Sequence, residues 1–273
     1  MKRRKLFNLI KGLLAWALSI IVIVPFLLVI LNSLKTNVQA DLMNLSIPDS
    51  FHFENFIIVI EKGKLIRSFL NSTIISGFTV FITVIVSAAA AFVLSRNKSR
   101  LNKFFYKYFL VGLIAPLNMI PVIKMLQRFH LMSTYQGIIL LFTALLIPFS
   151  IFLYYEFIDS VPRELDESAF LDGCTPLVLF IDIILPLLKP VTITVVIINF
   201  MNAWNDFVIP LYIMNNTEYW PMTLAVYNFF GRFQSEWNLV CADILLTTLP
   251  IIIVYMMGQK YIIGGMVSGA VKG

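Results

Sequence analysis

The residues of this sequence that could do chemistry are mostly carboxylates, and a cluster of charged residues lies in one short stretch. Residues 162–190 read PRELDESAFLDGCTPLVLFIDIILPLLKP, and the charges near the start of this stretch are Arg163, Glu164, Asp166, Glu167 and Asp172. Carboxylates act as general acids or bases when they are held within hydrogen-bond reach of a reacting group. The two histidines of the chain, His52 and His130, are far apart in the sequence. The cluster therefore indicates an acidic helix in a very apolar chain, and no catalytic pair is visible.

Motifs for nucleotide, metal or covalent chemistry are absent from the sequence. There is no GxxxxGK[ST] phosphate-binding loop, no HExxH, no GxSxG, and no Cys/His cluster at zinc spacing. Three isolated acids, Asp182, Asp206 and Asp243, lie near the ends of expected membrane spans, where a capping or interfacial role is favoured over a functional intramembrane charge. We therefore expect that the chain is not an enzyme and that it binds no metal or cofactor. The energy for any active process must come from a partner.

The composition is that of an integral membrane protein built from helices. Of 273 residues, 59% are hydrophobic and 13% charged, and the mean hydropathy is +0.86, whereas a soluble domain carries about 25% charged residues. The net charge of +6 is attributed to orientation signals and contacts with anionic membrane lipid, so no nucleic-acid partner is expected. The two cysteines, Cys174 and Cys241, are expected on opposite sides of the membrane and unpaired.

Six transmembrane helices are expected. The first is uncharged from Gly12 to Leu34, which is longer than the apolar core of about 7–15 residues in a signal peptide. The third is interrupted by Pro116, Asn118 and Pro121. The expected spans cover residues 12–34, 68–95, 105–126, 136–157, 181–205 and 239–263. They form one domain over residues 12–263, between cytosolic ends at 1–11 and 264–273.

The orientation follows from the distribution of basic residues. With the N-terminus in the cytosol, fourteen of the twenty-one lysines and arginines fall on cytosolic segments, as the positive-inside rule requires. This arrangement places both termini and the acidic stretch in the cytosol. The longest polar segments, residues 35–67 and 206–238, then face outward, and the first of them should carry short helices.

The acidic stretch itself predicts a helix, a sharp turn and a second helix. Ser160 can cap the first helix and Pro162 suits its first turn. Gly173 suits the position just after the helix ends. Thr175 and Pro176 are typical of the cap and first position of the next helix.

The same stretch carries a family signature. Glu167-Ser168-Ala169, then Gly173, Ile183 and Leu185-Pro186, have the spacing E-A-A, three residues, G, nine residues, I-x-L-P. This pattern resembles the EAA motif of ABC-importer permeases. Ser168 replaces the middle alanine of the motif with another small residue.

The resemblance implies that residues 160–177 form a cytosolic coupling loop between the fourth and fifth spans. A rigid helix there would sit in a groove of a partner ATPase, which binds ATP and Mg²⁺ and moves the helix when two ATPase subunits close. The residues implied in this coupling are Glu164, Asp166, Glu167, Ser168, Ala169, Asp172, Gly173 and Pro186.

Further runs resemble the second permease of carbohydrate importers of the maltose type. They are Asn32-Ser33-Leu34-Lys35, Asn71-Ser72, Trp204-Asn205-Asp206-Phe207, Leu249-Pro250 and Gly264-Gly265. The resemblance implies that the fifth span ends by the translocation pathway and that residues 212–237 form a loop that docks a binding protein. An aromatic belt at the membrane interface remains the alternative for the aromatic residues. The candidate residues are Trp204, Asn205, Asp206, Phe207, Tyr219 and Trp220.

Taken together, these features predict a permease subunit of a binding-protein-dependent ABC importer for a sugar or oligosaccharide, in a bacterial or archaeal cell membrane. The implied partners are a second, homologous permease, an ATP-binding cassette ATPase dimer and an extracytoplasmic substrate-binding protein. Glycerol phosphate or another sugar derivative is the alternative substrate. An ion-coupled secondary transporter is the alternative of another class, but it should show broken helices at matched places in two repeats, and no internal repeat is visible.

Overall fold

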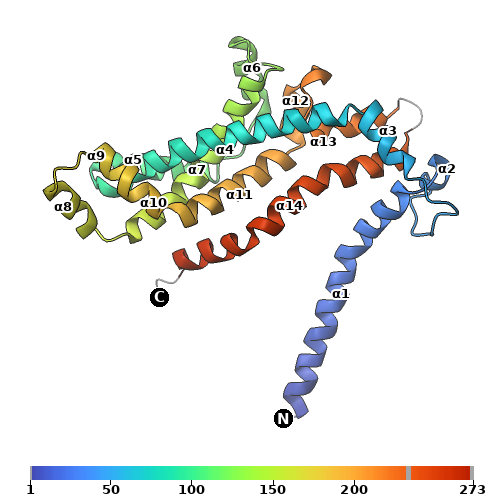
Figure 1. Cartoon of the computed structure of the whole chain (residues 1–273), viewed down its shortest axis with the longest axis horizontal. Coiled ribbons are helices and arrows are strands. Elements are labelled where there is room, and N and C mark those ends of the chain that lie inside the picture. Colours follow the sequence, from blue (N-terminus) through green and yellow to red (C-terminus); the bar gives the residue numbers. More distant parts are fainter. Residues whose placement is uncertain (1, 232–234, 271–273) are drawn as a thin grey trace. The chain divides into compact units, whose positions relative to one another are not determined.

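The computed structural model describes residues 2–231 and 235–270, and all the regular structure in these ranges is helical (Figure 1), apart from one isolated bridge between Phe230 and Ser235. The chain divides into two compact units. One contains the residues up to Arg67 together with Ala225–Pro250, and the other contains Ser68–Leu224 and the residues from Ile251 onward. The helical fold class predicted from the composition is therefore confirmed.

The first unit contains three N-terminal helices and the start of the last helix. These are α1 (Lys2–Ser33), α2 (Asn37–Ala40), α3 (Glu54–Lys62), a 3₁₀ turn η3 (Val226–Phe229) and the first part of α14 (Trp237–Ala270). The two short helices α2 and α3 lie in the polar segment 35–67, as expected from the sequence.

A buried ammonium group organises this polar segment. The Nζ atom of Lys35, which is 0% exposed, donates to Asn32 Oδ1 at 3.1 Å and to Asn44 O and Oδ1 at 2.9 and 2.8 Å. Asn55 donates to the carbonyls of Ser33 and Lys35 at 2.8 and 3.0 Å and accepts from Asn238 at 3.0 Å. Because a buried charge is stable only when its hydrogen bonds are made, these contacts fix the path of the chain after α1.

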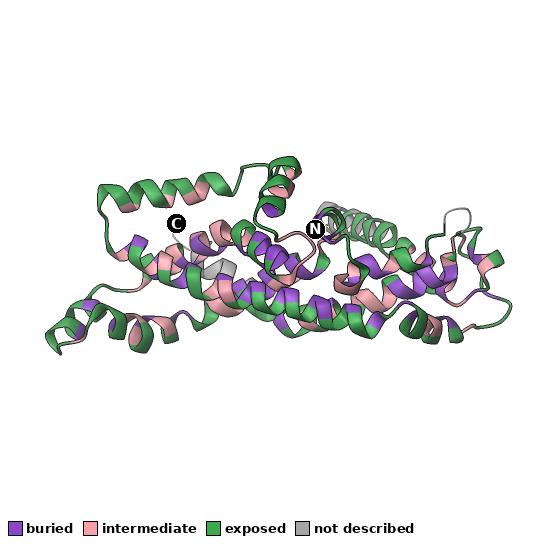
Figure 2. Cartoon of the chain, turned by 90° about the horizontal axis from the view of Figure 1, so that it is seen from above, coloured by how far each residue is buried: buried purple, intermediate pink, exposed green. Residues whose placement is uncertain are grey.

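The second unit consists of the part of α14 that begins at Ile251 and, among the described residues, of twelve further helical elements. They are α4 (Leu65–Arg96, shared with the first unit), α5 (Arg100–Gly112), α6 (Met119–Arg128), α7 (Tyr135–Ser160), α8 (Glu164–Leu171), α9 (Pro176–Val178), a π-helix η1 (Leu179–Ile184), α10 (Leu185–Leu187), α11 (Lys189–Asn205), α12 (Val208–Ile213), η2 (Thr217–Tyr219) and α13 (Met222–Ala225). The longer helices α7 and α11 combine buried and exposed positions, whereas α5, α9, α10 and η2 have no buried residue. Figure 2 shows buried and exposed residues side by side along the helices.

Small residues of α4 share a core cluster with α7. Ala88 and Ala91 are 1% and 0% exposed and lie in one core cluster with Tyr154 of α7, and such small residues let neighbouring helices approach closely. Two side-chain hydrogen bonds join α7 to α11, from Tyr154 to Thr192 at 3.1 Å and from Asn199 to Ser150 at 2.9 Å. The helix α7 is thus held on two sides.

Four helices in the described residues are long and apolar enough to cross a membrane, or five if one bent pair counts as a single span. The four are Leu14–Ser33, Leu65–Arg96, Tyr135–Ser160 and Trp237–Tyr261, and they correspond to the first, second, fourth and sixth expected spans. The bent pair, Pro176–Leu187 and Lys189–Asn205, turns by 75° and contains the fifth.

The third expected span, residues 105–126, differs from the prediction. It is divided between α5 and α6, with a non-helical break that contains Pro116. Asn118 caps α6 by accepting from the Ile120 amide at 3.2 Å, and Pro121 lies in the first turn, where its missing N–H is tolerated. The interruption that the sequence signalled therefore ends one helix and starts another.

Candidate functional site

The acidic helix α8 begins later than the sequence predicted. Ser160 is the last residue of α7, where its hydroxyl donates to Phe157 O at 2.6 Å, and Arg163 occupies the N-cap of α8. The prediction that Ser160 caps α8 and that Pro162 lies in its first turn is therefore wrong. No side chain caps α8 at its N-terminus. The acidic residues Glu164, Asp166 and Glu167 in the first turn stabilise this end instead, because they lie at the positive end of the helix dipole.

The end of α8 forms a Schellman motif. Gly173 has φ +82°, its amide donates to Phe170 O at 3.1 Å, and the amide of Cys174 donates to Ala169 O at 2.9 Å. The next helix starts at once, because Thr175 caps α9 by accepting from Val178 N at 3.4 Å and is followed by a proline. The predicted helix, sharp turn and second helix are thus present.

The candidate coupling residues lie on two different faces of α8. Glu164, Glu167, Ser168 and Asp172 are exposed, whereas Ala169 is 4% and Asp166 8% exposed. Ala169 belongs to the core cluster that also contains residues of α4, α7 and η1. Glu164, Glu167 and Asp172 form an acidic outer face, which is available to a partner.

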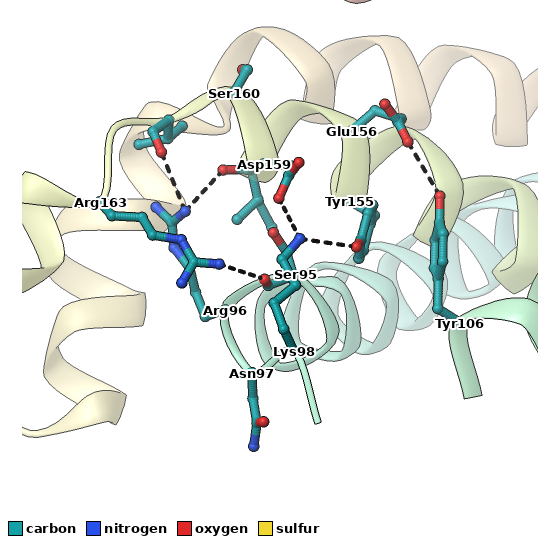
Figure 3. A network of polar contacts seen from close by, with 12 residues as sticks. Ser95, Arg96, Asn97, Lys98, Tyr106, Tyr155, Glu156, Asp159, Ser160 and Arg163 are labelled. Carbon is teal, nitrogen blue, oxygen red and sulfur yellow. Dashed lines mark hydrogen bonds and ion pairs between the residues drawn. The ribbon is translucent and has the colours of Figure 1, made fainter. Parts of the chain in front are cut away.

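Asp166 faces inward, in contrast to the expectation that it would meet a partner. Its carboxylate forms an ion pair with Arg96, the last residue of α4, at 2.7 Å from Nε to Oδ2 and 3.2 Å from Nη2 to Oδ1. The Nη1 group of Arg96 also donates to the carbonyls of Ile158 and Val161, both at 3.2 Å (Figure 3). In the sequence, Arg96 counts only among the basic residues that indicate orientation, and nothing local reveals its partner 70 residues away.

More polar contacts join the segments around this junction. Arg163 donates to Ser95 O at 3.4 Å, and Lys98 donates to Asp159 at 2.6 Å and to Tyr155 OH at 3.1 Å (Figure 3). The hydrogen bond to Asp159 raises the pKa of Lys98, so this side chain stays charged throughout the physiological pH range. The Lys98–Asp159 pair is more than one third exposed on both sides and is therefore expected to stabilise little.

Pro186, the last residue of the signature, lies just before the 75° bend at Leu188. The preceding residues form the π-helix η1, and the amide of Leu188 donates to both Ile184 and Leu185 at 3.1 Å. Proline and π-helical turns are recognised causes of helix bends. The last residues of the signature therefore lie at a bend in the helical segment that follows α8.

The Trp204–Phe207 group divides between the core and the surface. Trp204 is 3% exposed and packs against Phe69 and Phe200, with ring centroids 5.8 and 5.2 Å apart. Asn205 is exposed and Phe207 half-buried. Trp204 is thus a packing residue in this structure, whereas a pathway contact was expected.

The three isolated acids also differ from one another. Asp206 precedes Phe207, the N-cap residue of α12, and accepts from Ile209 N at 2.7 Å, so a capping contact is present as expected. Asp182 is exposed within η1. Asp243 is 1% exposed and lies inside α14, so the capping role predicted for it is wrong, and the interfacial role stays a prediction.

Tyr219 and Trp220 hold the segment after α12 in place. The indole of Trp220 donates to Met214 O at 2.9 Å, and Tyr219 makes an edge contact with Tyr135 at 5.0 Å between ring centroids. Asn71 donates to the carbonyls of Glu218 and Trp220 at 3.0 and 2.9 Å. Both aromatic residues are half-buried, and their contacts are structural.

A cavity of about 460 Å³ with a mixed polar and apolar lining lies beside the end of α11. It is lined by Ile198, Met201, Asn202, Asn205, Asp206 and Tyr255. Amide, carboxylate and phenol groups can donate to and accept from hydroxyl groups. Neither Asn202 nor Tyr255 was among the predicted site residues. Asn202 lies one turn before Asp206 on α11, so its proximity is local in the sequence. Tyr255 reaches the cavity only because α14 residues after Pro250 pack against α11. No cluster of histidine, cysteine or acidic residues suited to a metal ion occurs among the described residues.

The chain is similar in sequence to membrane components of transport systems. Residues 82–267 match the family model described as binding-protein-dependent transport system inner membrane component. The chain is 32% identical over 93% of both chains to the probable starch degradation products transport system permease protein AmyC of Thermoanaerobacterium thermosulfurigenes. It is 35% identical to the melibiose/raffinose/stachyose import permease protein MelC of Bacillus subtilis, over 92% of this chain and 91% of the relative.

A solved structure shares the fold. A chain of a bacterial ABC transporter involved in the import of the acidic polysaccharide alginate superposes with a TM-score of 0.84 at 20% identity, and the match covers 96% of this chain and 98% of the other. The fold described above is therefore that of an ABC-importer transmembrane chain.

Proposed function

The chain belongs to the family of inner membrane components of binding-protein-dependent transport systems, and from this premise we propose that it forms half of the translocation pathway of an ABC importer for a neutral sugar or oligosaccharide. The observation that carries the proposal is α8, a short helix with an exposed acidic face and a fixed Schellman turn. Relatives named for the transport of starch degradation products and of raffinose-type sugars support the substrate class.

In this proposal α8 is the coupling helix. The outer carboxylates of Glu164, Glu167 and Asp172 face basic or hydrogen-bond donor groups of a cytosolic ATPase, which binds the ATP and Mg²⁺. A second permease completes the pathway, and an extracytoplasmic binding protein delivers the substrate. Because the carboxylate of Asp166 forms an ion pair with Arg96, Asp166 is not part of the proposed contact with the ATPase.

The charges in the lining of the cavity at the end of α11 support a neutral substrate. Its lining contains one carboxylate, that of Asp206, and no lysine or arginine. An anionic ligand such as glycerol phosphate would meet this carboxylate without a compensating charge. Sugar hydroxyls can instead be hydrogen-bonded by Asn202, Asn205 and Tyr255.

Removing the Tyr255 hydroxyl tests whether the cavity at the end of α11 binds the substrate. We expect Tyr255→Phe to raise the KM for uptake about three- to tenfold, because one hydrogen bond contributes about 0.5–1.5 kcal/mol. Uptake of radiolabelled sugar by reconstituted importer measures this effect. Tyr227→Phe, which removes a phenol that does not line the cavity, is the control, and equal KM values in both variants would exclude Tyr255 from the substrate path.

We further propose six spans with both termini in the cytosol, α5 and α6 together forming the third. Cys174 is half-buried and next to α8, whereas Cys241 is 1% exposed. A membrane-impermeant maleimide should therefore label Cys174 in inside-out vesicles and leave it unlabelled in right-side-out vesicles. Labelling of Cys174 from the outside would overturn both the topology and the coupling role.

The overall proposal is tested with the complete importer. The chain is purified together with the ATPase, the second permease and the binding protein that neighbouring genes encode. ATP hydrolysis by this complex should rise when the binding protein is loaded with sugar. Uptake by this chain alone in liposomes, driven by an ion gradient, would instead identify a secondary transporter.

A further inference from the structure

A single guanidinium joins three elements at the end of α4. Arg96 contacts both carboxylate oxygens of Asp166 in the first turn of α8 and the Ile158 and Val161 carbonyls at the end of α7. A planar guanidinium can make such paired contacts in fixed geometry, and an ammonium cannot. The contacts therefore define how α8 sits against α4 and α7.

The electrostatics of the junction favour this arrangement. The last carbonyls of α7 carry the partial negative charge of a helix C-terminus, and Arg96 compensates them together with the carboxylate of Asp166. The side chains of the pair are only 11% and 12% exposed. Removing either partner would leave the other charge poorly solvated and unpaired.

Asp166 is the only buried acid of α8, since Glu164, Glu167 and Asp172 are exposed. A carboxylate that points into the permease cannot bind the ATPase while it holds Arg96. Its position connects the proposed ATPase-facing helix to a helix long enough to cross the membrane, because Arg96 ends α4 (Leu65–Arg96).

We propose that Arg96 and Asp166 are a positioning pair that transmits the movement of α8 to α4 and α7, so that ATP hydrolysis and substrate translocation stay coupled. This inference rests on the proposed function of α8. The outer face of α8 receives the movement, and the inner pair carries it into the membrane helices. Without the pair, α8 can still follow the ATPase, but α4 and α7 follow it poorly.

The test uses the complete importer in proteoliposomes, with Asp166→Asn and Arg96→Lys as separate variants. For each, ATP hydrolysis and sugar uptake are measured with loaded binding protein, and the result is expressed as sugar transported per ATP hydrolysed. We expect this ratio to fall about tenfold in both variants while ATP hydrolysis continues, a change that corresponds to about 1.4 kcal/mol. A residue that only stabilised the fold would lower both activities together and leave the ratio unchanged.

Asp159→Asn is the matched control, because it removes a carboxylate from an exposed ion pair with Lys98 at the same junction that does not involve α8. Its ratio should equal that of the wild type. A wild-type ratio in Asp166→Asn or in Arg96→Lys would overturn the inference. If Asp166→Asn fails to assemble, the milder Arg96→Lys decides, since it keeps the positive charge beside Asp166.

The experiment can refute the positioning pair and the proposed function separately. A wild-type importer whose ATP hydrolysis does not respond to loaded binding protein would refute the proposed function itself. A wild-type importer that responds, with variants that keep the full ratio, would refute only the positioning pair.

Discussion

Replacing Glu167 with lysine is expected to abolish uptake and to release the ATPase from the purified complex. Glu167 is exposed on the first turn of α8, where a basic or donor groove of the ATPase is proposed to bind. A lysine there would place like charges in contact, which costs several kcal/mol at an interface. We expect uptake to fall by more than about 100-fold, since each 1.4 kcal/mol corresponds to a factor of ten.

The measurement is co-purification of the ATPase with a tagged permease, together with sugar uptake in vesicles. Glu61→Lys is the control because it makes the same charge change on the exposed end of α3, in a segment proposed to face outward. It should leave both assembly and uptake close to wild type. Full assembly of the Glu167→Lys variant would show that α8 does not bind the ATPase through this face.

The long helices were predictable because the membrane imposes a simple requirement on the chain. A span in lipid must satisfy its backbone internally and remain apolar over most of its length, so α4 and α7 could be located within a few residues from uncharged runs alone. The turn after α8 was equally local, because a glycine, a threonine and a proline within four residues determine its geometry. Such features depend on near neighbours in the sequence.

The features that the sequence did not reveal depend on distant residues. The burial of Asp166 depends on Arg96, and the buried ammonium of Lys35 depends on Asn44 and on the fold of the polar segment after α1. Trp204 is apolar enough for either a core or a surface, and only its contacts with Phe69 and Phe200 place it in the core. Composition and spacing carry no information about such pairings.

A large loss of uptake is also expected when Gly173 is replaced by a residue with a branched Cβ. The φ of +82° at Gly173 lies in a region that side chains with a branched Cβ adopt only at a cost of about 1–2 kcal/mol. Gly173→Val should therefore open the Schellman turn and release α8 from its fixed direction. We expect uptake to fall about thirtyfold, from a cost of about 2 kcal/mol, while the chain remains inserted in the membrane.

Two further variants separate backbone conformation from side-chain volume. A Cβ at Gly173 would meet no atom of this chain within 4 Å, so the loss in Gly173→Val cannot come from a clash inside the permease. Gly173→Asn adds volume but tolerates a positive φ, and Gly12→Val adds the same side chain at another open position in a helix, where φ is not positive. If valine at 173 abolishes uptake while asparagine preserves it, the turn geometry is required for coupling. If both abolish uptake and the chain is still inserted, the space beside Gly173 is filled by the ATPase. Wild-type uptake in Gly173→Val would contradict the role of a fixed α8 in coupling, because the movement would then reach the membrane helices without the turn.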